Sequence, residues 1–226
     1  GVVMTRAFVF PGQGSQFIGM GKDLADAFTD AKDVFEMVDD ALSQNLSKIM
    51  WEGPESDLNL TENTQPALMA VSMAVVNVLK KQGGIKIEDC CAFVAGHSLG
   101  EYSALTAAGA LEIADTARLL KTRGQAMQAA VPVGVGAMAA ILGLEFEEVK
   151  AIADQASGDE VCQAANDNSV GQVVVSGHKG AVEAAVALAT ERGAKKAVTL
   201  PVSAPFHCSL MAPAAQKMAT ALADTN

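Results

Sequence analysis

The chain has 226 residues, of which 50% are apolar, and it carries a formal net charge of −10. This length and apolar content are typical of a packed globular protein, and the acidic balance excludes a general nucleic-acid binder, because neutralising phosphates requires a basic surface. Because no apolar run approaches the roughly 18 residues of a membrane span and the N-terminal residues lack a signal-peptide layout, we expect a cytoplasmic protein with neither a nucleic-acid nor a membrane partner.

The first half of the chain alternates short apolar runs with longer helical patterns. Residues 6–10 and 91–95 are predicted to form buried strands. Helical patterns cover about residues 23–50, 65–82, 101–109 and 113–130. This alternation is typical of an α/β fold with a parallel sheet.

The pattern changes after Val133. Strand-like segments are expected at 136–142, 161–165, 172–176 and 197–202, with helix-like segments at 146–156 and 181–192. A turn is expected at Asn166–Ser169, between the second and third strands. The resulting order, βαββαβ, is that of a ferredoxin-like unit. We therefore predict two domains: an α/β-hydrolase-like body of residues 1–131 and 202–226, and an inserted ferredoxin-like subdomain of residues 132–201.

Cysteine and histidine usage argues against disulfide and metal chemistry. The four cysteines form neither a CxxC pair nor a disulfide-like framework. With only three histidines, a His/Cys metal cluster has little support. We expect no metal and no permanently bound cofactor.

A nucleophile motif lies between the second predicted strand and the helix that follows it. Residues 96–100, Gly-His-Ser-Leu-Gly, fit the G-x-S-x-G pattern of a nucleophile elbow. Glycines two residues either side of the serine suit a turn that has no room for side chains. The helix N-terminus would place backbone N–H groups near the serine oxygen. A chance pentapeptide is the alternative, but the strand–turn–helix context favours Ser98 as a nucleophile.

A serine nucleophile needs a base, and the three histidines differ in their suitability. His97 neighbours Ser98 on the elbow, so the two side chains should point apart. His178 lies in a predicted turn, where a solvated histidine is the simpler interpretation. His207 follows a predicted strand and a Pro-containing loop, and it comes after the serine, as in α/β-hydrolases. No acidic residue stands out as a third member, so we predict a Ser98–His207 dyad.

The helix predicted at 113–130 carries two arginines on different faces. Arg118 has mostly polar neighbours at helical spacing, whereas the neighbours of Arg123 are Leu119, Leu120, Ala126 and Met127. A guanidinium on an apolar face needs a partner, because an unpaired buried charge is costly. The partner of Arg123 is either a structural carboxylate or the carboxylate of a substrate, which arginine can hold in a bidentate pair.

A glycine-rich turn, Gly12-Gln13-Gly14-Ser15-Gln16, follows the first predicted strand. A dinucleotide-binding loop is a weak interpretation, because Phe17 stands where the third glycine of that motif belongs. The glycines would instead bring the backbone and Gln13 close to a neighbouring site. An amide donor there would suit an oxyanion hole beside the elbow.

Taken together, these segments resemble the malonyl-CoA:acyl-carrier-protein transacylases of bacterial fatty acid biosynthesis. The resemblance covers essentially the whole chain. Its markers are Phe10–Gln16, Thr64-Gln65-Pro66-Ala67, Gly96–Glu101, Arg123-Gly124 and Pro205-Phe206-His207. The family normally continues for several dozen residues beyond residue 226, so the resemblance suggests that the C-terminal part is lacking.

The resemblance implies an acyltransferase that moves malonyl from malonyl-CoA to acyl carrier protein by double displacement. Ser98 would be the nucleophile, His207 its base, and the backbone N–H groups of Gln13 and Leu99 the oxyanion hole. Arg123 would bind the malonyl carboxylate. Asn166 falls where the family has a polar residue near the site. Two alternatives remain open: a serine esterase or thioesterase with the same elbow, and a fragment without catalytic activity.

Two further expectations concern specificity and partners. Phe206 could fill the space that an α-methyl branch of the substrate would need, or it could simply pack in the core. Arg192, Lys195 and Lys196 form a basic cluster in an acidic chain. They could dock an acidic carrier protein, or they could be solvated charges at a helix end.

Overall fold

The computed structural model describes residues 5–202 and 204–226. The chain divides into two compact units, Gly1–Gln125 with Thr220–Asn226, and Ala126–Ala219. This division differs from the domain boundaries at 131 and 202 that we expect from the sequence, and those boundaries stay a prediction. Within the described ranges, no helix is both long enough and apolar enough to cross a membrane.

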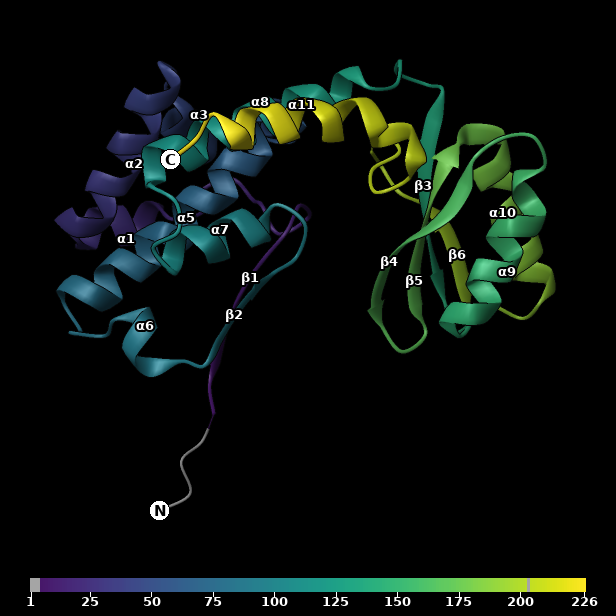
Figure 1. Ribbon diagram of the computed structural model, residues 1–226, viewed down its shortest axis with the longest axis horizontal. Coiled ribbons are helices and arrows are strands. Elements are labelled where there is room, and N and C mark those ends of the chain that lie inside the picture. Colours follow the sequence, from purple (N-terminus) through teal and green to yellow (C-terminus); the bar gives the residue numbers. More distant parts are fainter. Residues whose placement is uncertain (1–4, 203) are drawn as a thin grey trace. The chain divides into compact units, whose positions relative to one another are not determined.

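The first unit contains a parallel pair of strands with helices packed beside it (Figure 1). Strand β1 (Ala7–Phe10) pairs with β2 (Phe93–Gly96). Six helices lie between them in sequence: α1 (Lys22–Ala27), α2 (Thr29–Leu42), α3 (Leu46–Glu52), α4 (Glu55–Leu58), α5 (Thr61–Lys81) and α6 (Ile87–Cys90). After β2 come α7 (Gly100–Ala107) and α8 (Ile113–Ala129). The mixed α/β fold with a parallel sheet is thus confirmed.

Two of the predicted helices have different bounds in the structure. The single helix expected over 23–50 is wrong, because three helices, α1, α2 and α3, occupy that stretch. Phe28 is extended (φ −133°) and its ring packs against the core, while Ser43 adopts a left-handed conformation (φ 47°). Helix α5 begins at Thr61, earlier than the expected residue 65, and it accommodates Pro66 in its second turn.

The second unit is built on a four-stranded antiparallel sheet with the order β4-β5-β3-β6. Its elements are β3 (Gly136–Leu142), α9 (Phe146–Ser157), β4 (Cys162–Ser169), β5 (Gln172–His178), α10 (Lys179–Glu191) and β6 (Lys196–Thr199). Helices α9 and α10 lie on one face of the sheet (Figure 1) and bury Ile141, Ile152 and Val182 against it. The chain ends with a short 3₁₀ turn (Ser209–Met211) and α11 (Ala212–Ala223).

The turn expected at Asn166–Ser169 is wrong. These four residues belong to β4, where Asn166 pairs with Val174 of β5. The pairing shifts register after Ala164 and again after Asp167, which lets this polar stretch follow the strand through two irregularities. The chain reverses at Val170-Gly171 instead, where Gly171 has a φ of 74°.

Candidate active site

Ser98 lies at the sharp turn between β2 and α7. Its φ of 55° is unusual for a residue with a side chain. The turn is closed by a hydrogen bond from the Gly100 N–H to the His97 carbonyl, at 2.9 Å, and by one from the Glu101 N–H to the Ser98 carbonyl, at 3.1 Å. This is the strand–turn–helix geometry that the G-x-S-x-G motif predicts.

The two glycines of the motif are required by close backbone contacts. A Cβ atom on Gly96 would lie 1.9 Å from the carbonyl carbon of Gly100, inside any allowed contact. A Cβ atom on Gly100 would lie 2.4 Å from the carbonyl oxygen of Phe10, at the end of β1. The elbow is therefore packed against both strands of the parallel pair, and this packing fixes the position of the Ser98 backbone.

The glycine-rich turn after β1 is held beside this elbow. Gly12 packs directly on His97, since a Cβ there would lie 2.6 Å from both Nδ1 and the carbonyl oxygen of the histidine. Gln16 accepts a hydrogen bond from the Gly14 N–H and donates one to Asn59. The Gln13 side chain accepts a hydrogen bond from the hydroxyl of Thr61, at 2.9 Å.

Arg123 reaches Ser98 from helix α8. Its Nη1 donates to Oε1 of Gln65 at 2.7 Å, and its Nη2 lies 3.3 Å from Oγ of Ser98. The guanidinium carbon is 5.5 Å from the centre of the Tyr102 ring, a cation–π distance. Within the described ranges, Arg123 forms no ion pair with a carboxylate. The structure thus offers no support for a structural salt bridge of this arginine.

Burial shifts the pKa values of Arg123 and of its aromatic neighbour Tyr102. Burial lowers the pKa of Arg123, and the nearby Tyr102 and Glu101 oppose that shift only partly. Burial also raises the pKa of Tyr102, and the positive charge of Arg123 opposes the rise without cancelling it. Tyr102 therefore stays a neutral phenol at physiological pH, and it faces the guanidinium as a ring rather than as an anion.

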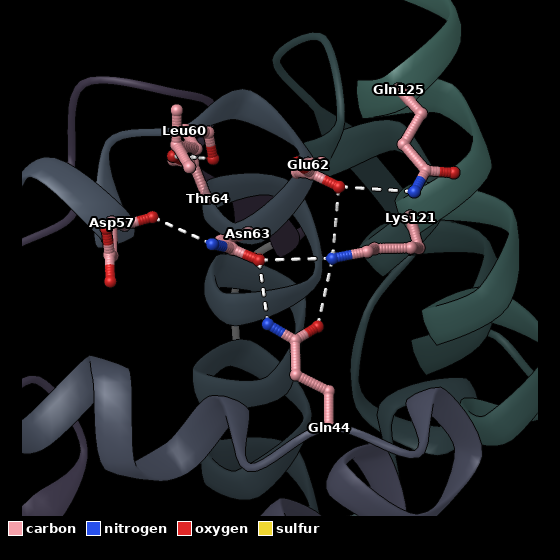
Figure 2. A network of polar contacts seen from close by, with 8 residues as sticks. All are labelled: Gln44, Asp57, Leu60, Glu62, Asn63, Thr64, Lys121 and Gln125. Atoms are coloured by element: carbon pink, nitrogen blue, oxygen red, sulfur yellow. Dashed lines mark hydrogen bonds and ion pairs between the residues drawn. The ribbon is translucent and has the colours of Figure 1, made fainter.

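A polar network centred on Lys121 fastens α8 to the start of α5 (Figure 2). The Lys121 ammonium donates to Gln44 at 2.9 Å and to Asn63 at 3.2 Å, and it forms an ion pair with Glu62 at 3.2 Å. Gln125 of the same helix also donates to Glu62. With its side chain only 22% exposed, Lys121 is held from several sides, and Arg123 follows two residues later on the same helix.

Gly124 lies at a close contact between helices α8 and α5. A Cβ atom there would lie 2.5 Å from the Cα of Glu62 and 2.7 Å from the carbonyl oxygen of Thr61. We expect Gly124→Ala to force α8 away from α5 and to lower the free energy of unfolding by about 1–3 kcal/mol, as overpacking does. Urea unfolding would measure this loss.

Gly180→Ala is the matched control for this change. Gly180 is also a helical glycine, but its added Cβ would meet only the flexible end of Glu160, at 3.3 Å. Alanine should be neutral or slightly stabilising there, because it restricts the unfolded chain. Equal unfolding midpoints for the two variants would contradict the close contact at Gly124.

The other predicted site residues belong to the second unit. His207 is exposed and has a φ of 60°, another left-handed conformation in a residue other than glycine. Phe206 is buried, at 7% exposure, in an apolar cluster with Met138, Val174 and Met211. Asn166 is partly buried in β4. Because Ser98 belongs to the first unit, the Ser98–His207 pair stays a prediction.

The expectation of a solvated His178 is wrong. The residue ends β5, and its Nδ1 accepts a hydrogen bond from the Val161 N–H at 2.9 Å. This imidazole closes the start of β4 against the end of β5, so it has a structural role.

Sequence reasoning missed three residues around Arg123. Thr61 and Tyr102 carry no motif of their own, and Gln65 appears only within the Thr64–Ala67 marker without a role. Gln65 could have been found from its context: a buried amide, 1% exposed, must have hydrogen-bonding partners. One partner, Thr61, lies one turn earlier on the same helix, but the other, Arg123, is 58 positions away in the sequence.

Comparison with known proteins agrees with this geometry. The model of the acyl transferase domain family matches residues 7–226. The chain belongs to the acyl transferase domain family.

Several proteins similar to this acyl transferase domain are malonyl transferases. The malonyl CoA-acyl carrier protein transacylase of Escherichia coli K12 is 48% identical over 96% of the chain and 69% of its own length. The crystal structure of the Bartonella henselae acyl-carrier-protein-S-malonyltransferase is 59% identical, with a TM-score of 0.96 over 99% of this chain and 71% of that one. A malonyl-transacylase in complex with a type II PKS acyl-carrier protein is 44% identical, with a TM-score of 0.94 over the same shares of the two chains.

Proposed function

We propose that this acyltransferase moves a malonyl group from malonyl-CoA to the phosphopantetheine thiol of acyl carrier protein, for fatty acid biosynthesis, through a malonyl ester of Ser98. One observation carries the proposal beyond general acyl transfer. The Arg123 guanidinium lies 3.3 Å from the Ser98 hydroxyl oxygen, and among the described residues it forms no ion pair with a carboxylate. A cation beside the nucleophile suits an acyl group that carries its own carboxylate.

The reaction takes place in two displacements. The Ser98 hydroxyl attacks the thioester carbonyl while His207 takes its proton, and the backbone N–H groups of Gln13 and Leu99 receive the negative oxygen. The C–S bond then breaks, and coenzyme A leaves with the proton from His207. In the second displacement the carrier thiol gives its proton to His207 and attacks the malonyl ester. The ester C–O bond then breaks, and His207 returns the proton to the Ser98 oxygen.

Three features support these roles. Ser98 is at a strained elbow just before the N-terminus of α7, where the positive end of the helix dipole favours an anion. The Gly12–Gln13 segment packs on the elbow, which suits a second oxyanion donor. Arg123 distinguishes this function from that of a simple serine esterase, which has no use for a cation beside its nucleophile.

Several finer expectations form part of the same proposal. The body is α/β-hydrolase-like, and the βαββαβ order and the strand order β4-β5-β3-β6 favour a ferredoxin-like subdomain. Asn166 and Phe206 remain candidate substrate contacts, although the burial of Phe206 also suits a role in the core. No permanent cofactor is proposed, and the cytoplasmic location stays a prediction.

Malonyl-CoA treatment followed by mass spectrometry tests the proposal. We expect the protein to gain one malonyl group on the peptide that contains Ser98. Addition of carrier protein with its phosphopantetheine arm should then move the group to the carrier. An esterase or thioesterase would release free malonate without a carrier, and an inactive fragment would gain no mass.

The basic cluster Arg192, Lys195 and Lys196 is a candidate docking surface for the carrier protein. All three residues are exposed, and among the residues that the structure describes none of them forms an ion pair. Arg192 contacts only a neutral amide, that of Gln155. The cluster therefore has its positive charge available to an acidic partner.

Reversing both Lys195 and Lys196 to glutamate should raise the KM for carrier protein several-fold and leave malonyl loading of Ser98 unchanged. Charges at the rim of an interface mainly affect the rate of association, and salt screens them. The rise in KM should therefore be smaller at high salt. The matched control reverses Lys80 and Lys81, two exposed lysines at the end of α5, with the same change in net charge. An equal rise in KM for both double variants would refute the docking surface.

A further inference from the structure

A continuous chain of side-chain hydrogen bonds links the glycine-rich turn to the nucleophile. Thr61 donates to Gln13 at 2.9 Å and accepts from the Gln65 amide at 3.0 Å. Gln65 in turn accepts from Arg123 at 2.7 Å, and Arg123 reaches Ser98 at 3.3 Å. The chain therefore joins residues from the turn after β1, from α5, from α8 and from the elbow between β2 and α7, and Thr61 links the Gln13 turn to Gln65.

The direction of every bond in this chain follows from Arg123. A guanidinium has donors only, so Gln65 must present its oxygen to it and its NH₂ group to Thr61. The Thr61 hydroxyl then accepts from Gln65, and its single hydrogen is left to donate to Gln13. Reversing the Gln65 amide would set donor against donor at Arg123. Thr61 is the residue that satisfies both amides at once.

Burial makes this arrangement rigid. Thr61 is 4% exposed and Gln65 is 1% exposed, so water cannot readily replace either partner. Thr61 is β-branched, and its χ1 angle is restricted in a helix. Its carbonyl oxygen also lies under Gly124, at the close contact of α5 with α8. The residue thus touches the turn of Gln13 through its side chain and the helix of Arg123 through its backbone.

We propose that Thr61 is a positioning residue that couples the Gln13 turn to the Arg123 guanidinium and thereby helps to set the preference for malonyl over acetyl groups. This inference rests on the proposed function. Without the hydroxyl, the Gln65 amide loses the acceptor that fixes its orientation, and its oxygen no longer holds Arg123 in one place. Acyl groups with a carboxylate depend on Arg123, whereas acetyl groups do not.

Thr61→Val tests the coupling, because valine keeps the shape of threonine and removes only the hydroxyl. We expect the ratio of kcat/KM for malonyl-CoA over acetyl-CoA to fall about 3- to 10-fold, the effect of losing one orienting hydrogen bond. Thr61→Ser, which retains the hydroxyl, should restore the ratio to within about twofold of the wild type.

Thr64→Val is the matched control. Thr64 lies one turn later in the same helix and is fully buried, but its hydroxyl donates to the backbone carbonyls of Leu58 and Leu60. Figure 2 shows the contact with Leu60. This variant removes a buried threonine hydroxyl outside the chain to Arg123. It should lower the melting temperature without changing the malonyl-to-acetyl ratio.

The outcomes separate the inference from the function on which it rests. An unchanged ratio in a folded Thr61→Val protein, or equal ratios in the Thr61→Val and Thr64→Val proteins, would overturn the positioning role. If Thr61→Val does not melt cooperatively, Gln13→Leu tests the same chain, because it removes the acceptor of Thr61 and keeps the backbone N–H of residue 13. An unchanged malonyl-to-acetyl ratio in the Gln13→Leu protein would also overturn the positioning role. A wild-type protein that does not load malonyl would overturn the proposed function itself.

Discussion

Ser98→Ala is expected to abolish malonyl loading, with a loss of about 10⁴-fold or more, because no other group at the elbow can form the ester. The fold should survive the change. Alanine can occupy the same backbone position, and the contacts of Gly96 and Gly100 that hold the turn remain. Intact mass after malonyl-CoA treatment measures loading, and thermal unfolding measures the fold.

Ser103→Ala provides the control on the same helix. Ser103 is fully buried in α7, and among the residues that the structure describes its hydroxyl has no hydrogen-bonding partner. Loading should therefore be unaffected in this variant. If the Ser98→Ala protein still gained one malonyl group at a single site, Ser98 could not be the nucleophile.

Arg123→Ala is expected to change the choice of substrate rather than to abolish acyl transfer. Removing one partner of a desolvated, charge-assisted pair costs about 2–5 kcal/mol, or roughly 30-fold to several-thousand-fold. That loss should fall on kcat/KM for malonyl-CoA. Acetyl-CoA has no carboxylate for Arg123, so its use should fall little. The ratio of the two kcat/KM values is the measurement.

Arg118→Ala separates this specific effect from a general loss of positive charge. Arg118 lies on the same helix, but it is exposed and paired with Asp115 at 2.8 Å. Its removal should leave the ratio unchanged. If the ratio were also unchanged in a folded Arg123→Ala protein, Arg123 would have no part in recognising the malonyl carboxylate.

Local features of the site could be predicted from the sequence because they depend on neighbouring residues. The elbow needs glycines at positions two residues either side of Ser98, and the structure gives the steric reason for each. The apolar neighbours of Arg123 likewise follow from helical spacing, and they indicated a guanidinium that would need a special partner.

Features that depend on contacts between distant residues could not be predicted. Thr61 and Gln13 are separated by 48 positions, and Arg123 and Gln65 by 58, so no spacing rule brings them together. The same holds for His178, whose hydrogen bond to Val161 depends on the pairing of two strands. The helical pattern is interrupted at Phe28, whose ring packs against the core. The periodicity of apolar residues gives no sign of this contact.

The uncompensated charge of Arg123 also bears on the evolution of this protein. Among the residues that the structure describes, this partly buried guanidinium contacts an amide, a hydroxyl and an aromatic ring, and it forms no ion pair. Burying a cation without an anion destabilises a fold, so an apolar residue of similar length at this position would give a more stable but undiscriminating protein. Selection for stability alone would favour the loss of Arg123, whereas selection for malonyl over other acyl groups would retain it. A malonyl carboxylate bound to Arg123 would offset this loss of stability. The malonyl-loaded protein should therefore be more stable than the unloaded protein.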